Sequence, residues 1–165
     1  LEKRYKNSAK IILQKINSGN QVAYLTIGDP LLYSTYIYLL GALKESAQDL
    51  VIETIPGISA YSAVAARFSY SMAEKNEKVC ICPVPTDIND LKKTILDHDT
   101  IVLMKVAKKL PEIVKLLQEM GIGQDAIFGS HVGMAGEKLI KGFKNNCSFS
   151  EKEGYLSTII VRKRK

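Results

Sequence analysis

Two short turns contain the residues best suited to bind a small molecule. Gly28, followed by an aspartate and a proline, ends the apolar segment 22–27, and Pro56-Gly57 ends the apolar segment 50–55. A glycine backbone lets a ligand approach closely, and the free N–H groups of a following helix can face the same edge. Because ligands bind open α/β sheets at the carboxyl ends of their strands, the two turns together predict a small-molecule cleft. Taken singly, each is more typical of an ordinary tight turn.

Motifs for nucleophilic or metal-assisted hydrolysis are missing from the sequence. It contains no G-x-S-x-G, H-E-x-x-H, Walker or G-x-G-x-x-G pattern. The two histidines, His98 and His131, lie far apart in the chain and are each more typical of a surface or hydrogen-bonded residue than of a catalyst. Hydrolysis is therefore not favoured.

The cysteine pattern points to packing rather than to chemistry. Cys80 and Cys82 lie in the apolar run VCICPV, where the period of a strand places both side chains on one face. No histidine or second cysteine pair lies near enough in sequence to complete a zinc-like set, and Cys147 is isolated. We expect three reduced thiols and no metal bound by the protein.

Length and charge set the class of protein. The 165 residues suit one ordinary domain or two small ones, and their 23 Lys+Arg against 17 Asp+Glu give a net charge of +6. This charge favours contact with polyanions. Much of it lies in the run 162–165, which is typical of a solvated basic tail. No apolar stretch is long enough for a membrane helix, so we expect a cytoplasmic protein.

Periodicity predicts an α/β fold, because segments of helical period alternate with apolar runs bounded by turn residues. The polar stretch 69–78 predicts a domain boundary, which gives an amino-terminal α/β domain over residues 1–75 and a carboxyl-terminal α/β domain over residues 76–165. Helices are predicted at 9–16 and 31–43 and from residues 59, 86 and 111, and strands at 22–27, 50–55 and 79–84 and from residues 100, 126, 137 and 155.

Four segments carry a family resemblance. GDPLLYSTYIYL, IPGISAYSAVAA, VLMKV and a closing YLSTIIVRK follow one another in an order and at separations that resemble the tetrapyrrole (corrin/porphyrin) methylases. The GDP-x-x-Y turn, the tyrosine-rich segment after it and the lysine after the methionine favour the branch that methylates C20 of precorrin-2. The resemblance covers nearly the whole chain.

The resemblance implies two α/β domains with S-adenosylmethionine in a cleft between them. The family's opening strand and glycine- and proline-rich loop have no counterpart here, so the first domain is expected to be incomplete. We therefore expect a carboxyl-terminal fragment that folds but does not turn over by itself. The resemblance also implies a homodimer and a polycarboxylate tetrapyrrole substrate, with or without cobalt, that is converted in cobalamin biosynthesis.

Individual site residues follow from the same resemblance. The cofactor-binding positions that it implies are Ile27, Gly28, Asp29, Leu32, Ser59, Ala60, Met104, Val132 and Gly133. Position 133 lies in GSHVGMAGEKL, which departs from the family's usual segment. Tyr33 and Tyr36 could line the substrate side, although a packed aromatic helix is the simpler interpretation. No residue is identified as a catalytic base.

Two other functions stay open at this point. A related methylase could act on another tetrapyrrole position or on ribose in ribosomal RNA, which the positive charge would also suit. Nucleic acid is the less favoured partner, because most of the excess charge lies in the run 162–165 and no stripe of aromatic and basic residues is evident. A non-catalytic ligand-binding domain is the alternative from a different class. Cofactor binding without turnover would favour it.

Overall fold

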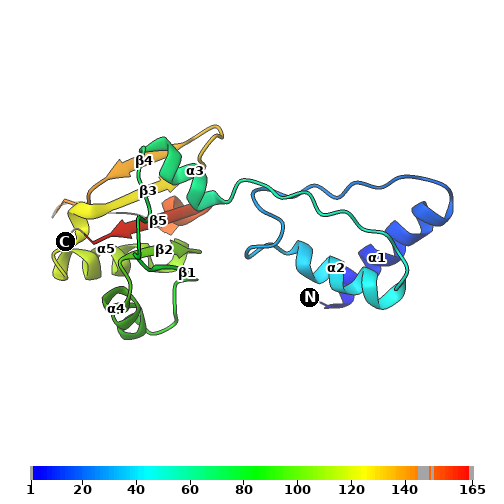
Figure 1. Ribbon diagram of the computed structural model, residues 1–165, viewed down its shortest axis with the longest axis horizontal. Coiled ribbons are helices and arrows are strands. Elements are labelled where there is room, and N and C mark those ends of the chain that lie inside the picture. The colour runs from blue at the N-terminus through cyan, green and yellow to red at the C-terminus, as the bar shows by residue number, and fades with distance from the viewer. Residues whose placement is uncertain (1, 145–148, 150, 164–165) are drawn as a thin grey trace. The chain divides into compact units, whose positions relative to one another are not determined.

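The computed structural model describes residues 2–144, 149 and 151–163. Its contacts divide the chain into two compact units, Leu1–Ser59 and Ala60–Lys165 (Figure 1). The division precedes the expected boundary because helix α3 (Ala60–Arg67) packs against strands of the second unit. The domain limits 1–75 and 76–165 stay a prediction.

A five-stranded mixed sheet forms the centre of the second unit, in the order β1-β2-β5-β3-β4. The strands are β1 (Val79–Pro83), β2 (Thr100–Met104), β3 (Ala126–Ser130), β4 (Lys138–Lys141) and β5 (Ser157–Arg162). Strands β1 and β2 are parallel, with helix α4 (Ile88–Asp97) as the crossover between them, and the other pairs of this sheet are antiparallel. The strands predicted from periodicity in this unit are thus confirmed.

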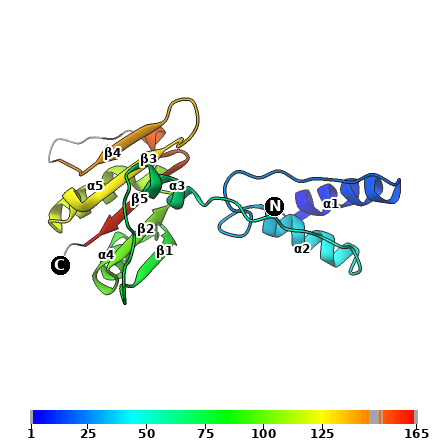
Figure 2. The same cartoon turned by 45° about the horizontal axis from the view of Figure 1, so that its top comes forward.

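Alternation along the central strands gives the sheet two apolar faces. On β2, Ile101 and Leu103 face the side covered by α4 and α5 (Leu110–Glu119), whereas Val102 faces the side covered by α3. Strands β3 and β5 repeat the pattern with Ile127 and Ile160 on the α3 side. The unit is therefore a helix–sheet–helix sandwich (Figure 2).

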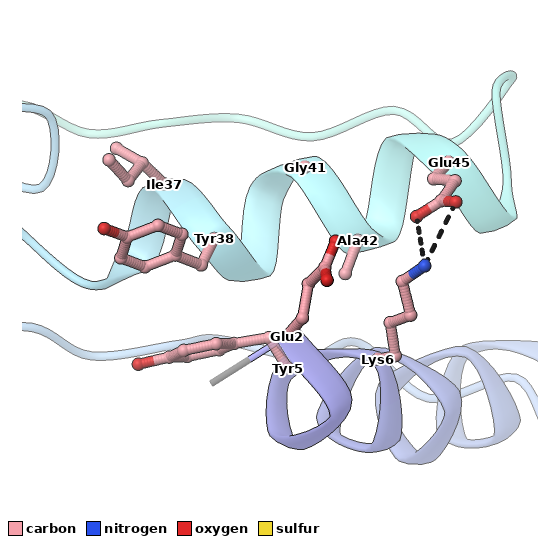
Figure 3. Close-up of a pocket in the computed structure, with 8 residues that line it drawn as sticks. All are labelled: Glu2, Tyr5, Lys6, Ile37, Tyr38, Gly41, Ala42 and Glu45. Carbon is pink, nitrogen blue, oxygen red and sulfur yellow. Dashed lines mark hydrogen bonds and ion pairs between the residues drawn. The ribbon is translucent and has the colours of Figure 1, made fainter.

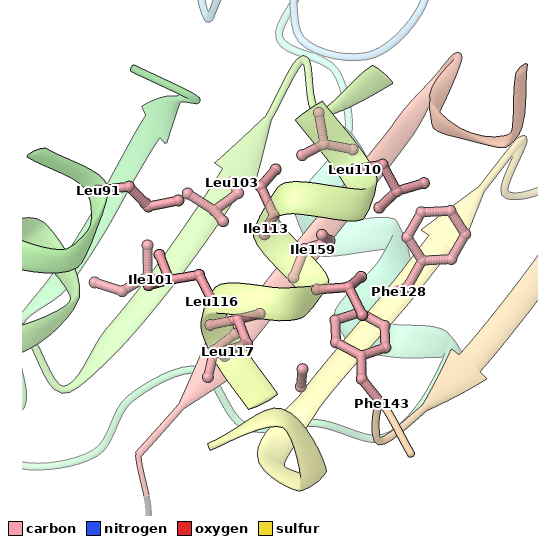
Figure 4. Close-up of a cluster of buried hydrophobic side chains, with 14 of the residues drawn as sticks. Leu91, Ile101, Leu103, Leu110, Ile113, Leu116, Leu117, Phe128, Phe143 and Ile159 are labelled. Atoms are coloured by element: carbon pink, nitrogen blue, oxygen red, sulfur yellow. The ribbon is translucent and has the colours of Figure 1, made fainter. Parts of the chain in front are cut away.

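The larger core lies between the sheet and α4 and α5 (Figure 4). Phe128 and Phe143 are fully buried there, and each lies against Phe149, with ring centroids 5.3 and 5.6 Å apart. Full burial of one such side chain contributes about 1.5–3 kcal/mol to folding. The positions predicted for the buried face of α5, Ile113, Val114 and Leu117, are confirmed. The core of this unit therefore does not depend on the first unit.

In the first unit, helices α1 (Glu2–Asn17) and α2 (Tyr36–Ser46) pack through four buried residues: Ala9, Leu39, Ala42 and Leu43. The two helices run in the same direction, and each is followed by an extended segment that runs back along them (Figures 1 and 2). Gly19 ends α1 with φ +83°, as the glycine stop predicts. Helix α2 begins later than predicted, because residues 31–35 form a turn.

Residues 22–27 and 50–55 are extended but are not strands, contrary to the prediction. Along 50–55 the side chains alternate strictly between half-buried and exposed, and Leu50 and Ile52 pack against the α1–α2 core. The period of a strand is thus present. A strand also needs a neighbour about 4.8 Å away to pair with, and within the described residues neither segment is hydrogen-bonded into a sheet.

The interpretation of 162–165 as a solvated tail is wrong for the two residues of the run that the structure describes. The Arg162 guanidinium pairs with Glu74 at 3.1 Å and Glu77 at 2.8 Å, and its backbone N–H donates to the Tyr70 hydroxyl at 2.8 Å. Lys163 donates to two carbonyls at the end of α4. Residues 164 and 165 lie outside the described range, as does Cys147.

The Arg162–Glu77 pair should make stability depend on pH. The hydrogen bond from Arg162 lowers the pKa of Glu77, so the pair stabilises the fold above the carboxyl's unfolded pKa, about 4.3, and its contribution is lost as pH falls through the folded value. We expect Glu77→Gln to lower the melting temperature at pH 7, and we expect this deficit to shrink as the pH falls below about 4.3. Glu119→Gln, which breaks an exposed helical pair, should change it much less. A deficit for Glu77→Gln that stays constant as the pH falls from 7 through and well below about 4.3 would contradict this prediction.

The cysteines of β1 are core residues. Both are partly buried against the α4–α5 side of the sheet, as expected from the strand period. Burial raises the pKa of Cys82 to about 12, and the neighbouring Cys80 adds to the shift. The Cys82 thiol therefore stays protonated and unreactive at neutral pH.

Within the described part of the chain, no helix combines the length and apolar character needed to cross a membrane.

Candidate functional site

The first of the predicted turns is a tight loop after segment 22–27. Gly28 adopts φ +76°, a conformation that side chains rarely allow, and the Asp29 carboxylate accepts a hydrogen bond from Leu31 N–H at 2.8 Å. Ile27 and Leu32 flank the turn, the former exposed and the latter half-buried. The aspartate thus holds the loop in shape, as its position after the glycine predicts.

The two glycine turns of the first unit meet backbone to backbone. A Cβ built on Gly57 would lie 2.3 Å from the Gly28 carbonyl oxygen and 3.0 Å from its carbon, closer than real side chains approach. A Cβ on Gly28 would in turn lie 3.6 Å from the Ile58 carbonyl oxygen. The convergence inferred from the sequence is therefore present, and it requires glycine at 57 for steric reasons that the sequence alone does not reveal.

The two tyrosines after the loop differ in their surroundings. Tyr33 has φ +54°, which is strained for a bulky residue, and it is exposed. Tyr36 is only 7% exposed, and its hydroxyl lies 2.9 Å from Thr54 Oγ1. The simpler of the two interpretations, a packed aromatic side chain, describes Tyr36, and a substrate contact by either tyrosine stays a prediction.

In the second unit, three strand ends meet at one edge of the sheet. Strands β2 and β3 end there, and β5 begins there between them, so Met104 and Gly129 both lie opposite Thr158. The residue just outside each of these ends has a positive φ, although none is glycine: Lys105 at +58°, His131 at +51° and Leu156 at +47°. Strained backbone of this kind is concentrated at functional sites.

The turn after β3 contains the predicted pair Val132-Gly133. Gly133 has φ +78° with open space around its Cβ position, and its N–H donates to the Glu137 carboxylate at 2.7 Å. Glu137 also pairs with Arg67 at the end of α3, and the hydrogen bond from Arg67 lowers the pKa of Glu137. The backbone N–H of Gly133, which lies in the pair expected to contact a cofactor, is thus already hydrogen-bonded within its own turn.

Sequence reasoning missed the residues that fix this edge. Arg67 and Glu137 are far apart in the chain, and no local pattern signals their pairing. In the sequence Lys105 stands out only as a member of VLMKV, and the left-handed backbone it adopts has no sequence signature. Ser59 and Ala60, by contrast, lie directly at the start of α3, which agrees with the helix predicted from residue 59.

A separate cavity is lined by residues of α1 and α2 (Figure 3). It has a volume of about 750 Å³ and is lined by both helices, with Tyr5 stacked on Tyr38 and an exposed Lys6–Glu45 ion pair. None of the predicted site residues lines it. Across the described residues, no three His, Cys, Asp or Glu side chains come together in a way that could hold a metal ion.

Comparison with known proteins identifies the family. The family model described as Tetrapyrrole (Corrin/Porphyrin) Methylases matches residues 1–144. The chain belongs to the tetrapyrrole methylases. Its mixed α/β architecture, with the five-stranded sheet, is the tetrapyrrole methylase fold.

Two curated tetrapyrrole methylases are similar over most of the chain. A probable cobalt-precorrin-2 C(20)-methyltransferase of Methanocaldococcus jannaschii is 34% identical over 165 residues, which cover 99% of this chain and 66% of that protein. The cobalt-precorrin-2 C(20)-methyltransferase of Salmonella typhimurium is 27% identical, over 94% of this chain and 64% of its own length. The chain thus spans about two thirds of the length of these two relatives.

Solved structures show the same fold at low identity. A cobalt precorrin-4 methyltransferase superposes with a TM-score of 0.69 at 18% identity, covering 94% of this chain and 69% of that one. A uroporphyrin-III C-methyltransferase from Thermus thermophilus, solved in complex with S-adenosylhomocysteine, superposes with a TM-score of 0.63 at 13% identity, covering 94% and 71%.

Proposed function

We propose that this chain belongs to an S-adenosylmethionine-dependent methyltransferase that methylates C20 of precorrin-2 or cobalt-precorrin-2 in cobalamin biosynthesis. One observation carries the proposal: relatives named for that reaction match 94% and 99% of the chain. A relative from Sinorhizobium, 29% identical over 124 residues, is named for the cobalt-free substrate. Cobalt, where present, belongs to the substrate.

The glycine turns and the strained sheet edge fit a cofactor. In this proposal, Gly28 and Asp29, with Ile27 and Leu32 beside them, form one portion of the cofactor site, and Ser59-Ala60 continue it. The Gly28–Gly57 backbone contact supports this role because no side chain separates the two turns. Met104 and the Val132-Gly133 turn supply the portion contributed by the second unit, where the backbone is strained.

The chemistry proposed for this site requires alignment more than proton transfer. S-adenosylmethionine supplies an activated methyl group bound to a sulfonium, and transfer is an in-line displacement. The chain's residues hold the donor in line with the acceptor and exclude water. The apolar side chain of Met104 and the backbone groups of the turns suit both tasks. Cationic side chains near the sheet edge, Lys105 among them, suit a polycarboxylate acceptor.

A chimeric enzyme tests the proposed function. These 165 residues replace the segment they match in the Methanocaldococcus jannaschii relative, and the product is hereafter called the chimera. We expect it to convert cobalt-precorrin-2 to a product carrying one additional methyl group at C20, detected by mass spectrometry and by ¹³C NMR with labelled donor. A folded chimera that binds S-adenosylhomocysteine but methylates neither form of precorrin-2 would contradict the proposed substrate. Size-exclusion chromatography with light scattering on the same sample tests the homodimer that the family resemblance implies.

A further inference from the structure

The turn that joins β3 to β4 contains two glycines in the left-handed conformation. Gly133 has φ +78° and Gly136 has φ +85°, and a Cβ on either would have open space around it. Met134 between them is 47% exposed. Side-chain packing therefore does not hold the tip of this turn, and the freedom of its glycine backbone must be restrained in another way.

One carboxylate supplies that restraint. Glu137 Oε2 accepts a hydrogen bond from the Gly133 N–H at 2.7 Å, while Oε1 accepts from Arg67 Nε at 3.1 Å and also from Arg67 Nη2. The Glu137 side chain is mostly buried, at 19% exposure, whereas that of Arg67 is half exposed. The two oxygens thus join the turn to the end of α3 through charge-assisted hydrogen bonds, which are stronger than neutral ones.

Helix α3 also packs directly on the sheet beside this turn. A Cβ on Gly129 of β3 would lie 2.7 Å from Val64 Cγ2 and 2.9 Å from Val132 Cγ2, so a side chain there would displace the valines. Val64 is 2% exposed, and Val132 packs against the same apolar cluster. The helix and the turn are therefore fixed to each other at two places, by packing at Val64 and by the ion pair at Arg67.

The backbone of Val132 has polar groups that the turn does not use. Among the described residues, neither its N–H nor its C=O takes part in a hydrogen bond, whereas the N–H groups of His131, Gly133 and Met134 are all bonded within the protein. Val132 is half-buried, and backbone groups removed from bulk water normally have a partner. The turn thus presents one donor and one acceptor to a ligand, and the Glu137 carboxylate fixes their direction.

We propose that Glu137 and Arg67 are positioning residues of the cofactor site, an inference that rests on the proposed function. The carboxylate holds the turn so that the Val132 backbone meets the cofactor in one conformation. The guanidinium links that turn to α3, which begins at the proposed cofactor residue Ala60. A site that is ordered before the ligand arrives does not lose affinity in becoming ordered. This arrangement lies in GSHVGMAGEKL, where the chain departs from the family's usual segment.

Titration calorimetry of the chimera with S-adenosylhomocysteine tests this role. We expect Glu137→Ala to weaken binding about tenfold, because the Gly133 N–H and the Arg67 guanidinium both lose their acceptor. Glu137→Gln keeps an acceptor for Gly133 but loses the charge that faces Arg67, so its loss should be smaller, about fourfold. Glu119→Ala removes an exposed ion pair on α5, which covers the opposite face of the sheet, and this matched control should bind like the parent.

Substitutions of the arginine show whether the two side chains act together. Arg67→Ala should weaken binding about fourfold, and Arg67→Lys should recover part of that loss, because lysine retains the charge without the planar fork. The double variant Arg67→Ala/Glu137→Ala should bind no more weakly than Glu137→Ala alone. Losses that add up in the double variant would contradict a shared role.

Steady-state kinetics of the chimera separate positioning from support of the fold. For Glu137→Ala we expect KM for S-adenosylmethionine to rise about tenfold while kcat at saturating donor stays within about twofold of the parent. The melting temperature should change by less than about 2 °C, because an ion pair with a half-exposed arginine contributes little to stability. A lower melting temperature and a lower kcat with KM unchanged would overturn the inference, since Glu137 would then support the fold alone.

The binding measurement also distinguishes this inference from the proposed function. A chimera that binds S-adenosylhomocysteine, and whose Glu137→Ala variant binds it equally well, would overturn the positioning role and leave the proposed function in place. A folded parent chimera that does not bind S-adenosylhomocysteine would contradict the proposed function, and the positioning role with it.

Discussion

Gly57→Ala is expected to lower the rate of methyl transfer by the chimera about a hundredfold and to weaken S-adenosylhomocysteine binding with it. The added Cβ would lie 2.3 Å from the Gly28 carbonyl oxygen, whereas ordinary contacts begin near 3.4 Å, so the two turns must separate by about 1 Å. A displacement of that size in a site that works by alignment costs about two orders of magnitude in rate. Steady-state kinetics and titration calorimetry measure the two effects.

The matched control is Gly41→Ala in α2. A Cβ there meets nothing within 4 Å, and alanine in place of glycine inside a helix stabilises it by about 0.5–1 kcal/mol. We expect unchanged kinetics and an equal or higher melting temperature. If Gly57→Ala retained the parent's affinity for S-adenosylhomocysteine, the Gly28–Gly57 contact would be a structural turn and the cofactor site would lie elsewhere.

The second large effect concerns the 165-residue chain without the rest of the chimera. We expect this chain to fold, with a cooperative thermal unfolding transition that comes from the second unit. We also expect it to transfer methyl groups at least about a hundredfold more slowly than the chimera. The second unit has a fully paired five-stranded sheet and a buried core, but the proposed cofactor turns of the first unit end two segments that lack strand partners within the described residues. Turns supported in this way hold a cofactor less rigidly.

A methylation assay with labelled donor compares the two proteins at equal concentration, and circular dichroism confirms that both are folded. Turnover by the 165-residue chain at a rate near that of the chimera would show that the turns do not depend on additional strands.

How far the sequence predicts the structure differs between the two units. In the second unit each predicted strand finds its neighbour within the chain, so alternation such as that of Ile101, Val102 and Leu103 suffices to predict both strand and burial. In the first unit the strand predicted at 50–55 is wrong although burial alternates along it with the period of a strand, because pairing depends on a partner that the sequence of the segment does not reveal.

The candidate site shows the same contrast between local and non-local information. The Asp29 turn and the left-handed Gly28 follow from residue type and are predictable. The interactions of Arg162 with Glu74 and Glu77 and of Arg67 with Glu137 join positions distant in sequence, and no single-sequence pattern encodes them. The ion pairs of Arg162 with Glu74 and Glu77 are the reason that the interpretation of 162–165 as a solvated tail is wrong at Arg162.

Strand β5 comes last among the strands of the second unit but lies at the centre of its sheet, between β2 and β3. Each of these neighbours therefore lacks one of its two hydrogen-bonding partners until residues 157–162 have been synthesised and have left the ribosome. Contacts of such long sequence separation slow folding and leave apolar edges exposed meanwhile. During translation, the sheet of the second unit thus stays incomplete until β5 emerges. A nascent chain stalled before that point would be a natural substrate for chaperones.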